Sequence, residues 1–156
     1  YLQESAATKG PGATAPIGLA TYISEAIVRD LKDGQFAGGN RVRLRLAHVW
    51  EEVNANPGEE WNLPALAKRM HVSVRQFQRI MKENYDVTAE GLLMRIRMEH
   101  ARELLSSTDM TMVMVADRIG YQCVFAFSKG FRRHFGMPPG AYRKAVNKGT
   151  IPHDVA

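Results

Sequence analysis

The chain is poor in the features that build disulfide frameworks, metal sites and membrane spans. Its 156 residues include one cysteine, Cys123, so no disulfide can form within the chain. The longest run without a charged residue, 10–24, is interrupted by glycine and proline and cannot cross a membrane. No His-Glu-x-x-His, Cys-x-x-Cys or phosphate-loop motif occurs, so we expect no enzymatic activity, no cofactor and no metal site. The single cysteine suits a reducing compartment, and we expect a cytoplasmic protein.

The chain does carry an excess of positive charge, and this excess is unevenly spread. The formal net charge is +5. Between Arg41 and Lys144, 17 Lys and Arg stand against 11 Asp and Glu, whereas the two ends together have a small negative net charge. The central region is therefore the basic part, which is compatible with a polyanionic partner without identifying one.

Composition and spacing divide the chain into three parts: an arm over 1–40, a main domain over 41–146 and a tail over 147–156. Within the arm, 1–18 and 34–40 have the glycine-rich composition of flexible joints, and 19–33 has the apolar spacing of one amphipathic helix. This helix either docks onto the main domain or ends an absent sensor or dimerisation domain, and the sequence leaves both open. Because the chain starts at Tyr1, we expect it to be a piece of a longer protein.

From Arg41 onward the apolar residues recur at helical spacing and no segment alternates with period two, so the sequence predicts an all-α fold of about seven helices. Four polar residues stand where helices are expected to begin. Their side chains can accept hydrogen bonds from the first turn, and the pair Ser73 and Gln76 has the spacing of a capping box. The four predicted caps are Asn62, Ser73, Thr88 and Thr111.

An internal repeat lies within this helical region. Residues 66–72 and 115–121 both follow the order apolar, Ala, polar, Arg, apolar, turn residue, apolar. With one residue inserted in the second copy, the match continues through four further pairs, which are Phe77 with Phe127, Arg79 with Lys129, Met81 with Phe131 and Lys82 with Arg132. Each copy has the layout of a helix-turn-helix unit, with His71 or Gly120 where a positive φ is often needed.

The second helix of each copy is predicted to have an inner and an outer face. The inner faces hold Phe77, Ile80 and Met81 in the first copy, and Phe127 and Phe131 in the second. The outer faces hold Arg75, Gln78, Arg79 and Lys82 in the first copy, and Lys129, Arg132 and Arg133 in the second. Arginine pairs with guanine and glutamine with adenine in the major groove, and cations neutralise phosphates. The outer face of a single such helix would be interpreted as an ordinary solvated surface. Two matched copies favour binding to double-stranded DNA.

A long helix predicted over 88–105 joins the two copies. At ~1.5 Å per residue it is on the order of 27 Å long. Two major-groove faces on one side of B-DNA lie roughly 34 Å apart, so a rigid helix of this size can hold two recognition helices near that separation.

At these residues the chain resembles the DNA-binding domain of AraC/XylS-type transcription regulators, over about Arg41 to Lys144. The most specific part is the segment 116–143, AxxxGYxxxxxFSKGFRRHFGMPPGAYR. The resemblance implies a seven-helix, two-part domain that binds DNA and activates or represses promoters, with RNA polymerase as a further partner. It places base contacts at Arg75, Gln78 and Arg79 in the first unit, and at Cys123, Val124, Ser128 and Lys129 in the second. We expect phosphate contacts at Ser73, Lys82, Arg132, Arg133 and Arg143.

Two departures from the family pattern concern the second unit. Gly130 lies inside the predicted recognition helix, where glycine costs roughly 1 kcal/mol relative to alanine. Val124 and Phe125 offer no hydrogen bonds to base edges, so this helix is expected to specify sequence weakly, through thymine-methyl contact or phosphate contacts. We expect the Cys123 thiol to be buried or inert, and Arg97 to have a structural or phosphate-binding role.

A protein-interaction module, in which the helix-turn-helix faces bind RNA polymerase or a regulatory partner, remains the alternative function. A homodimer, if one forms, is expected to use a missing upstream domain or the helix over 19–33.

Overall fold

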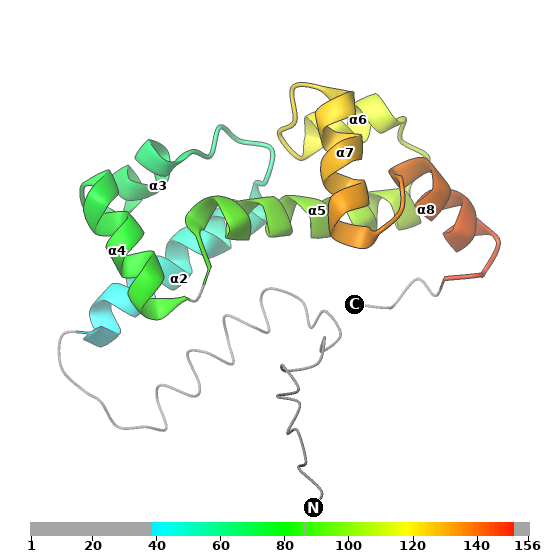
Figure 1. The fold of residues 1–156 in the computed structure, drawn as a ribbon. Coiled ribbons are helices and arrows are strands. Elements are labelled where there is room, and N and C mark those ends of the chain that lie inside the picture. Colours follow the sequence, from blue (N-terminus) through cyan, green and yellow to red (C-terminus); the bar gives the residue numbers. More distant parts are fainter. Residues whose placement is uncertain (1–38, 86, 152–156) are drawn as a thin grey trace, which may run out of the picture.

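The computed structural model describes residues 39–85 and 87–151, and within them it contains seven helices and no strand (Figure 1). This confirms the all-α prediction. The helices are α2 (Gly39–Ala55), α3 (Leu63–Met70), α4 (Val74–Asn84), α5 (Ala89–Ser107), α6 (Met112–Arg118), α7 (Val124–Phe135) and α8 (Pro139–Asn147). The predicted arm over 1–18 and the helix over 19–33 lie outside the described residues. Helix α2 begins at Gly39, two residues before the expected start of the main domain.

The helices begin where the sequence places polar caps. In each case a side-chain oxygen accepts a hydrogen bond from a backbone N–H three residues later, at 2.9–3.2 Å. The caps are Asn62, Ser73, Thr88 and Thr111, as predicted. The box is complete at Ser73, since its own N–H donates to Gln76 Oε1 at 3.0 Å. Such caps satisfy N–H groups that have no partner within the helix.

The core consists of two separate clusters. The first joins α2, α3 and α4 with the amino-terminal half of α5, and the second joins the carboxyl-terminal half of α5 with α6, α7 and α8. We call these two groups of helices the first unit and the second unit. Figure 1 shows them at opposite ends of α5.

Helix α5 serves both clusters with different faces. At 3.6 residues per turn, the residues that it buries in the first unit lie on the opposite side of the helix from those that it buries in the second. The first set is Ala89, Leu92, Leu93 and Ile96, and the second is Met98, Ala101 and Leu105. The two units therefore pack against opposite faces of one continuous helix.

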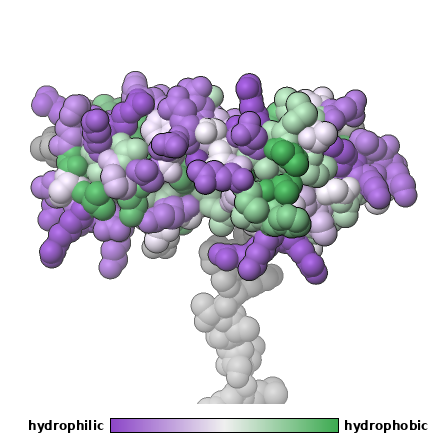
Figure 2. All heavy atoms as spheres, turned by 90° about the horizontal axis from the view of Figure 1, so that it is seen from above, coloured by the Kyte–Doolittle hydropathy of each residue, from purple (hydrophilic) through white to green (hydrophobic). Residues whose placement is uncertain are grey.

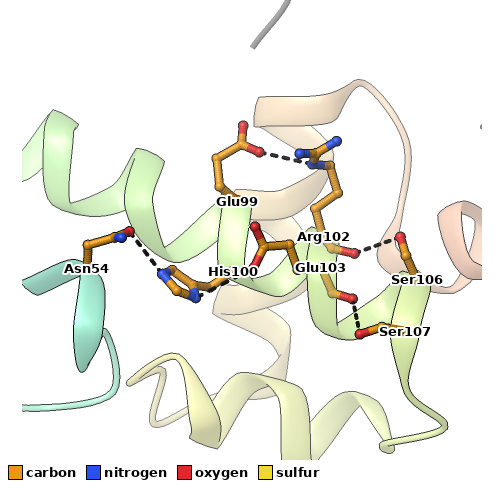
Figure 3. Close-up of polar contacts among 7 residues, drawn as sticks. All are labelled: Asn54, Glu99, His100, Arg102, Glu103, Ser106 and Ser107. Atoms are coloured by element: carbon orange, nitrogen blue, oxygen red, sulfur yellow. Dashed lines mark hydrogen bonds and ion pairs between the residues drawn. The ribbon is translucent and has the colours of Figure 1, made fainter. Parts of the chain in front are cut away.

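Polar contacts at the middle of the molecule join α5 to α2 and link residues within α5 (Figure 3). His100 lies 3.1 Å from Asn54 Oδ1 of α2, and within α5 Arg102 Nε donates to Glu99 Oε2 at 2.9 Å. Near the end of the helix, Ser106 and Ser107 donate to backbone carbonyls one turn earlier. None of the described helices has the length and apolar content needed to span a membrane.

Candidate nucleic-acid interface

Helices α3 and α4 form the first helix-turn-helix, and the turn between them depends on His71. This residue has φ 55° and ψ 42°, the left-handed conformation predicted for it, and its N–H donates to carbonyls of the last turn of α3. The chain then re-enters a helix at the Ser73 cap. A sharp reversal of this kind lets α4 pack across α3 while one side of α4 stays free.

The two faces of α4 differ as predicted. Phe77 and Met81 are buried in the first cluster, and Ile80 packs partly against it. The four predicted outward residues, Arg75, Gln78, Arg79 and Lys82, are all exposed. Arg79 lies 3.7 Å from Glu83, but both side chains are largely exposed, and such pairs contribute little. The first unit therefore presents three cations and one amide on the face opposite its core.

Ser73 keeps a free donor at the amino-terminal end of α4. Its Oγ accepts from the Gln76 N–H, so its hydroxyl hydrogen remains able to donate to a phosphate oxygen. The side chain is exposed and lies where the helix dipole favours an anion. Its predicted phosphate contact stays a prediction that this geometry permits.

Helices α6 and α7 form the second helix-turn-helix, with Gly120 at φ 81° in the turn. Phe127 and Phe131 are fully buried, and their rings meet edge to face with centroids 5.8 Å apart. The outward residues Lys129, Arg132 and Arg133 are exposed. The second unit thus repeats the layout of the first, with a buried aromatic face and an exposed cationic face.

The remaining predicted residues of the second unit differ from one another in their placement. Cys123 is exposed at the start of α7 and makes no side-chain capping bond, so the thiol is not buried, and its expected inertness stays a prediction. Ser128 is half-buried, and Val124 packs partly against the second cluster. Base contacts by these three residues stay predictions. The packing of Val124 against the second cluster leaves only part of its side chain accessible to DNA. The large apolar side chain exposed in this turn is Phe125, at which the family resemblance placed no base contact.

Arg143 is half-buried, and its guanidinium is directed into the protein. Its Nε donates to the carbonyl of Leu105 at 3.4 Å, while its Nη2 is buried without a hydrogen-bond partner in the described part of the chain. This contact joins α8 to the carboxyl end of α5. Arg143 therefore makes a structural contact, and its predicted phosphate contact stays a prediction.

Gly130 has a packing reason that the sequence did not reveal. A Cβ at this position would lie 3.3 Å from the Tyr121 hydroxyl, which is tighter than ordinary contact. Tyr121 in turn packs edge to face on Phe127. Tyr121 and Gly130 of the second unit thus lie close to each other.

Arg97 connects the two units. From the middle of α5 its Nε donates to Pro57 O and its Nη2 to Glu59 O, both at 3.0 Å. The same guanidinium lies against Gly120, where an added Cβ would be 2.8 Å from Nη2. Burial lowers the pKa of Arg97, and the neighbouring Tyr121 opposes this shift. Hydrogen bonds to backbone carbonyls therefore give Arg97 a structural role, as predicted.

The loop held by Arg97 also touches the second unit directly. A Cβ on Gly58 would lie 2.5 Å from the carbonyl oxygen of Arg118, at the end of α6. No side chain fits there without a backbone shift. This close approach sets the relative orientation of the units, and hence of α4 and α7.

A half-buried carboxylate lies between α5 and α7. Glu99 accepts from Arg102 and lies 3.8 Å from His134 Nε2 of α7. Burial alone raises the pKa of Glu99, but the neighbouring His134 and Arg102 outweigh it, so the pKa of this carboxyl is lowered. Glu99 therefore favours its ionised form beside Arg102 of α5 and His134 of α7.

The face of the molecule seen from above is mostly hydrophilic (Figure 2). Hydrophobic surface on this face gathers over the half that carries α6 and α7, with a second area at the opposite end. Among the described residues of that half, Val113, Met114 and Phe125 are exposed. No three His, Cys, Asp or Glu side chains gather within the described residues so as to hold a metal ion.

A family model described as a helix-turn-helix domain matches residues 66–145. The chain is 30% identical over 104 residues to the transcriptional activator RclR of Escherichia coli, which covers 67% of this chain and 37% of that protein. It is also 30% identical over 131 residues to the transcriptional regulator MtrA of Neisseria gonorrhoeae, covering 83% and 44%. The chain thus spans less than half the length of these relatives.

Solved structures agree with the sequence comparison. The DNA-binding domain of AdpA, solved in complex with a target DNA, is 30% identical with a TM-score of 0.65, over 67% of this chain and 95% of that one. A DNA-binding transcriptional dual regulator from Escherichia coli K-12 is 26% identical with a TM-score of 0.61, over 67% and 93%.

Proposed function

The chain belongs to the AraC/XylS-type helix-turn-helix family, and on that premise we propose that it is a sequence-specific DNA-binding transcription regulator. The family consists of transcription regulators rather than enzymes. In this proposal α4 and α7 insert into successive major grooves on one side of promoter DNA. The observation that supports it is the duplicated layout: two recognition helices, each with a buried apolar face and an exposed cationic face, at opposite ends of α5.

The first unit carries most of the sequence specificity. Arg75 and Arg79 each present a guanidinium that can bond the O6 and N7 of guanine, and Gln78 can pair with adenine. All three are exposed on the free face of α4. Lys82, one turn further along, binds a phosphate, as does the Ser73 hydroxyl at the start of the helix.

The second unit binds mainly through charge. Lys129, Arg132 and Arg133 are exposed on α7, and of these Lys129 lies at the position that Arg79 has in the first unit. Arg132 and Arg133 bind phosphates on either side of the groove. The second recognition helix therefore adds affinity and orientation, with less base discrimination than α4.

Further partners follow from this function. RNA polymerase is the proposed partner at the promoter, and one relative is named as an activator, so we propose activation of transcription. Dimerisation, if any, uses residues outside 39–151. Because its proposed target is promoter DNA, we place the protein in the cytoplasm.

Salt-dependent binding to duplex DNA tests the proposal. If Lys82, Arg132 and Arg133 each neutralise a phosphate, affinity should fall roughly 40-fold when salt is raised about fourfold, by counterion release. The triple variant with alanine at these positions should lose most of that dependence. A chain that binds no duplex even at low salt would instead favour the protein-interaction function.

Selection of bound sites from random duplex DNA then tests specificity. The proposal predicts a bipartite site with two contacts about one helical turn, roughly 34 Å, apart on one face. A single compact footprint, or no enrichment over random sequence, would contradict the arrangement of two recognition helices.

A further inference from the structure

Phe125 is the most exposed large hydrophobic side chain among the described residues. It is 80% exposed, compared with 62% for Val113 and 53% for Met114. It lies in the first turn of α7, the part of a recognition helix that contacts base edges in helix-turn-helix proteins. Leaving an aromatic ring in water forgoes the stabilisation that burial gives.

The internal repeat gives this position a counterpart in the first unit. Phe77 and Phe127 are equivalent and both fully buried, so the residues two positions earlier, Arg75 and Phe125, are equivalent as well. Both are exposed on the free faces of their helices. Where α4 has a guanidinium suited to guanine, α7 therefore has an aromatic ring.

Its neighbours leave Phe125 as the large apolar side chain exposed on the first turn of this helix, beside the small exposed Ala126. Val124 is half-buried against the second cluster, and Ser128 is half-buried as well. Lys129, one turn further along, is exposed but presents only a point charge. The sequence had left thymine-methyl contact and phosphate contact open for this unit. The exposed cations are chemically suited to phosphates, and the exposed ring of Phe125 is suited to an apolar group on a base edge.

We propose that Phe125 recognises the C5-methyl group of a thymine in the half-site bound by α7. The thymine methyl is the one apolar group that the four base pairs present in the major groove, and phenylalanine is among the side chains that contact it. The inference rests on the proposed DNA-binding function and adds to it a base preference: the second half-site contains a thymine that is recognised by its methyl group.

Replacing thymine by deoxyuridine tests this directly, because the exchange removes the methyl group and leaves base pairing unchanged. In the selected site, each thymine of the second half-site is exchanged in turn, and affinities are measured by fluorescence anisotropy at constant salt. The chain should lose about fourfold in affinity at one or two positions, the value of one buried methyl group. Phe125→Ala should bind the thymine and deoxyuridine duplexes equally at those positions.

Two control variants separate this contact from other effects. Val113→Ala removes an exposed apolar side chain from α6 and should keep the full response to deoxyuridine. Arg75→Ala should weaken binding to the first half-site and should also keep the full response to deoxyuridine in the second. Because Phe125 is exposed, its variant should unfold at an unchanged temperature, which excludes misfolding as the cause.

Three results would overturn the inference. The selected second half-site contains no preferred thymine, or wild type is indifferent to deoxyuridine at every position, or Phe125→Ala keeps the wild-type response. In each case specific duplex binding survives, so the proposed function stands while the methyl contact falls. If no duplex is bound at all, the proposed function and the inference fall together.

Discussion

Replacing Arg97 by alanine should loosen the connection between the two units. The side chain makes two hydrogen bonds to carbonyls of the loop after α2, both at 3.0 Å, and lies against Gly120 of the second unit. Hydrogen bonds from charged donors contribute about 1.5–3 kcal/mol each. Because one of the two bonds is exposed, we expect Arg97→Ala to lower the free energy of unfolding by about 2–3 kcal/mol in total, measured by urea denaturation.

The consequence for DNA binding is a change in spacing preference. One inserted base pair moves a half-site about 3.4 Å along the duplex and turns it by roughly 35°. A chain with firmly joined units should bind operators with one base pair inserted or removed much more weakly than the native spacing. Arg97→Ala should bind the native spacing more weakly than wild type, yet lose less when the spacing is changed. Anisotropy titrations of the three duplexes at one salt concentration measure this profile.

Two further variants serve as controls, one for the loss of a positive charge and one for its retention without the guanidinium. Arg95→Ala removes the same charge from an exposed position two residues earlier on α5 and should keep the wild-type spacing profile. Arg97→Lys keeps the charge without the planar fork and should fall between wild type and alanine. If Arg97→Ala weakens all three operators by one common factor, Arg97 does not orient the units and the reasoning is refuted.

The other predictions concern bases, packing and pH. Arg79→Ala should cost roughly 1–3 kcal/mol of binding and relax preference at one base pair, whereas Lys82→Ala should weaken all sequences alike; equal, sequence-independent losses would contradict a base contact by Arg79. Gly130→Ala should become about 1 kcal/mol more favourable for stability in a Tyr121→Phe background, because the hydroxyl that crowds the new methyl is gone; additive effects in thermal unfolding would exclude this contact. Folding lowers the pKa of Glu99, so its contribution to stability should be complete above its unfolded pKa and should decline as pH falls through the folded pKa. In Glu99→Gln the loss of stability at acid pH should therefore be less steep than in wild type. An equally steep loss would show that the lowered pKa has no role in stability.

Local features were predictable because each depends on residues three or four positions apart. The caps at Asn62, Ser73, Thr88 and Thr111 appear as expected, since side-chain acceptors and first-turn N–H groups are brought together by the helix itself. The left-handed turn at His71 and the cationic outer face of α4 follow from the same short-range geometry. The repeat then indicated two helix-turn-helix units, and the comparisons support that assignment.

Other site features were not predictable, because spacing does not show which face of a short helix another element covers. Val124 and Phe125 are adjacent apolar residues, and only the packing of the second cluster decides that the first is half-buried and the second exposed. Arg143 likewise appears suited to a phosphate in the sequence, but its guanidinium is directed toward the end of α5.

The sequence by itself determined that this protein consists of two matched helix-turn-helix units joined by a long helix, because helix starts, turns and amphipathic faces are encoded over a few residues. Only the tertiary structure decided how the units are oriented. The two units use opposite faces of α5, and Arg97 and Gly58 join them through contacts between residues about 20 to 60 positions apart. Contacts at such separations depend on how the assembled helices meet, which no local pattern records.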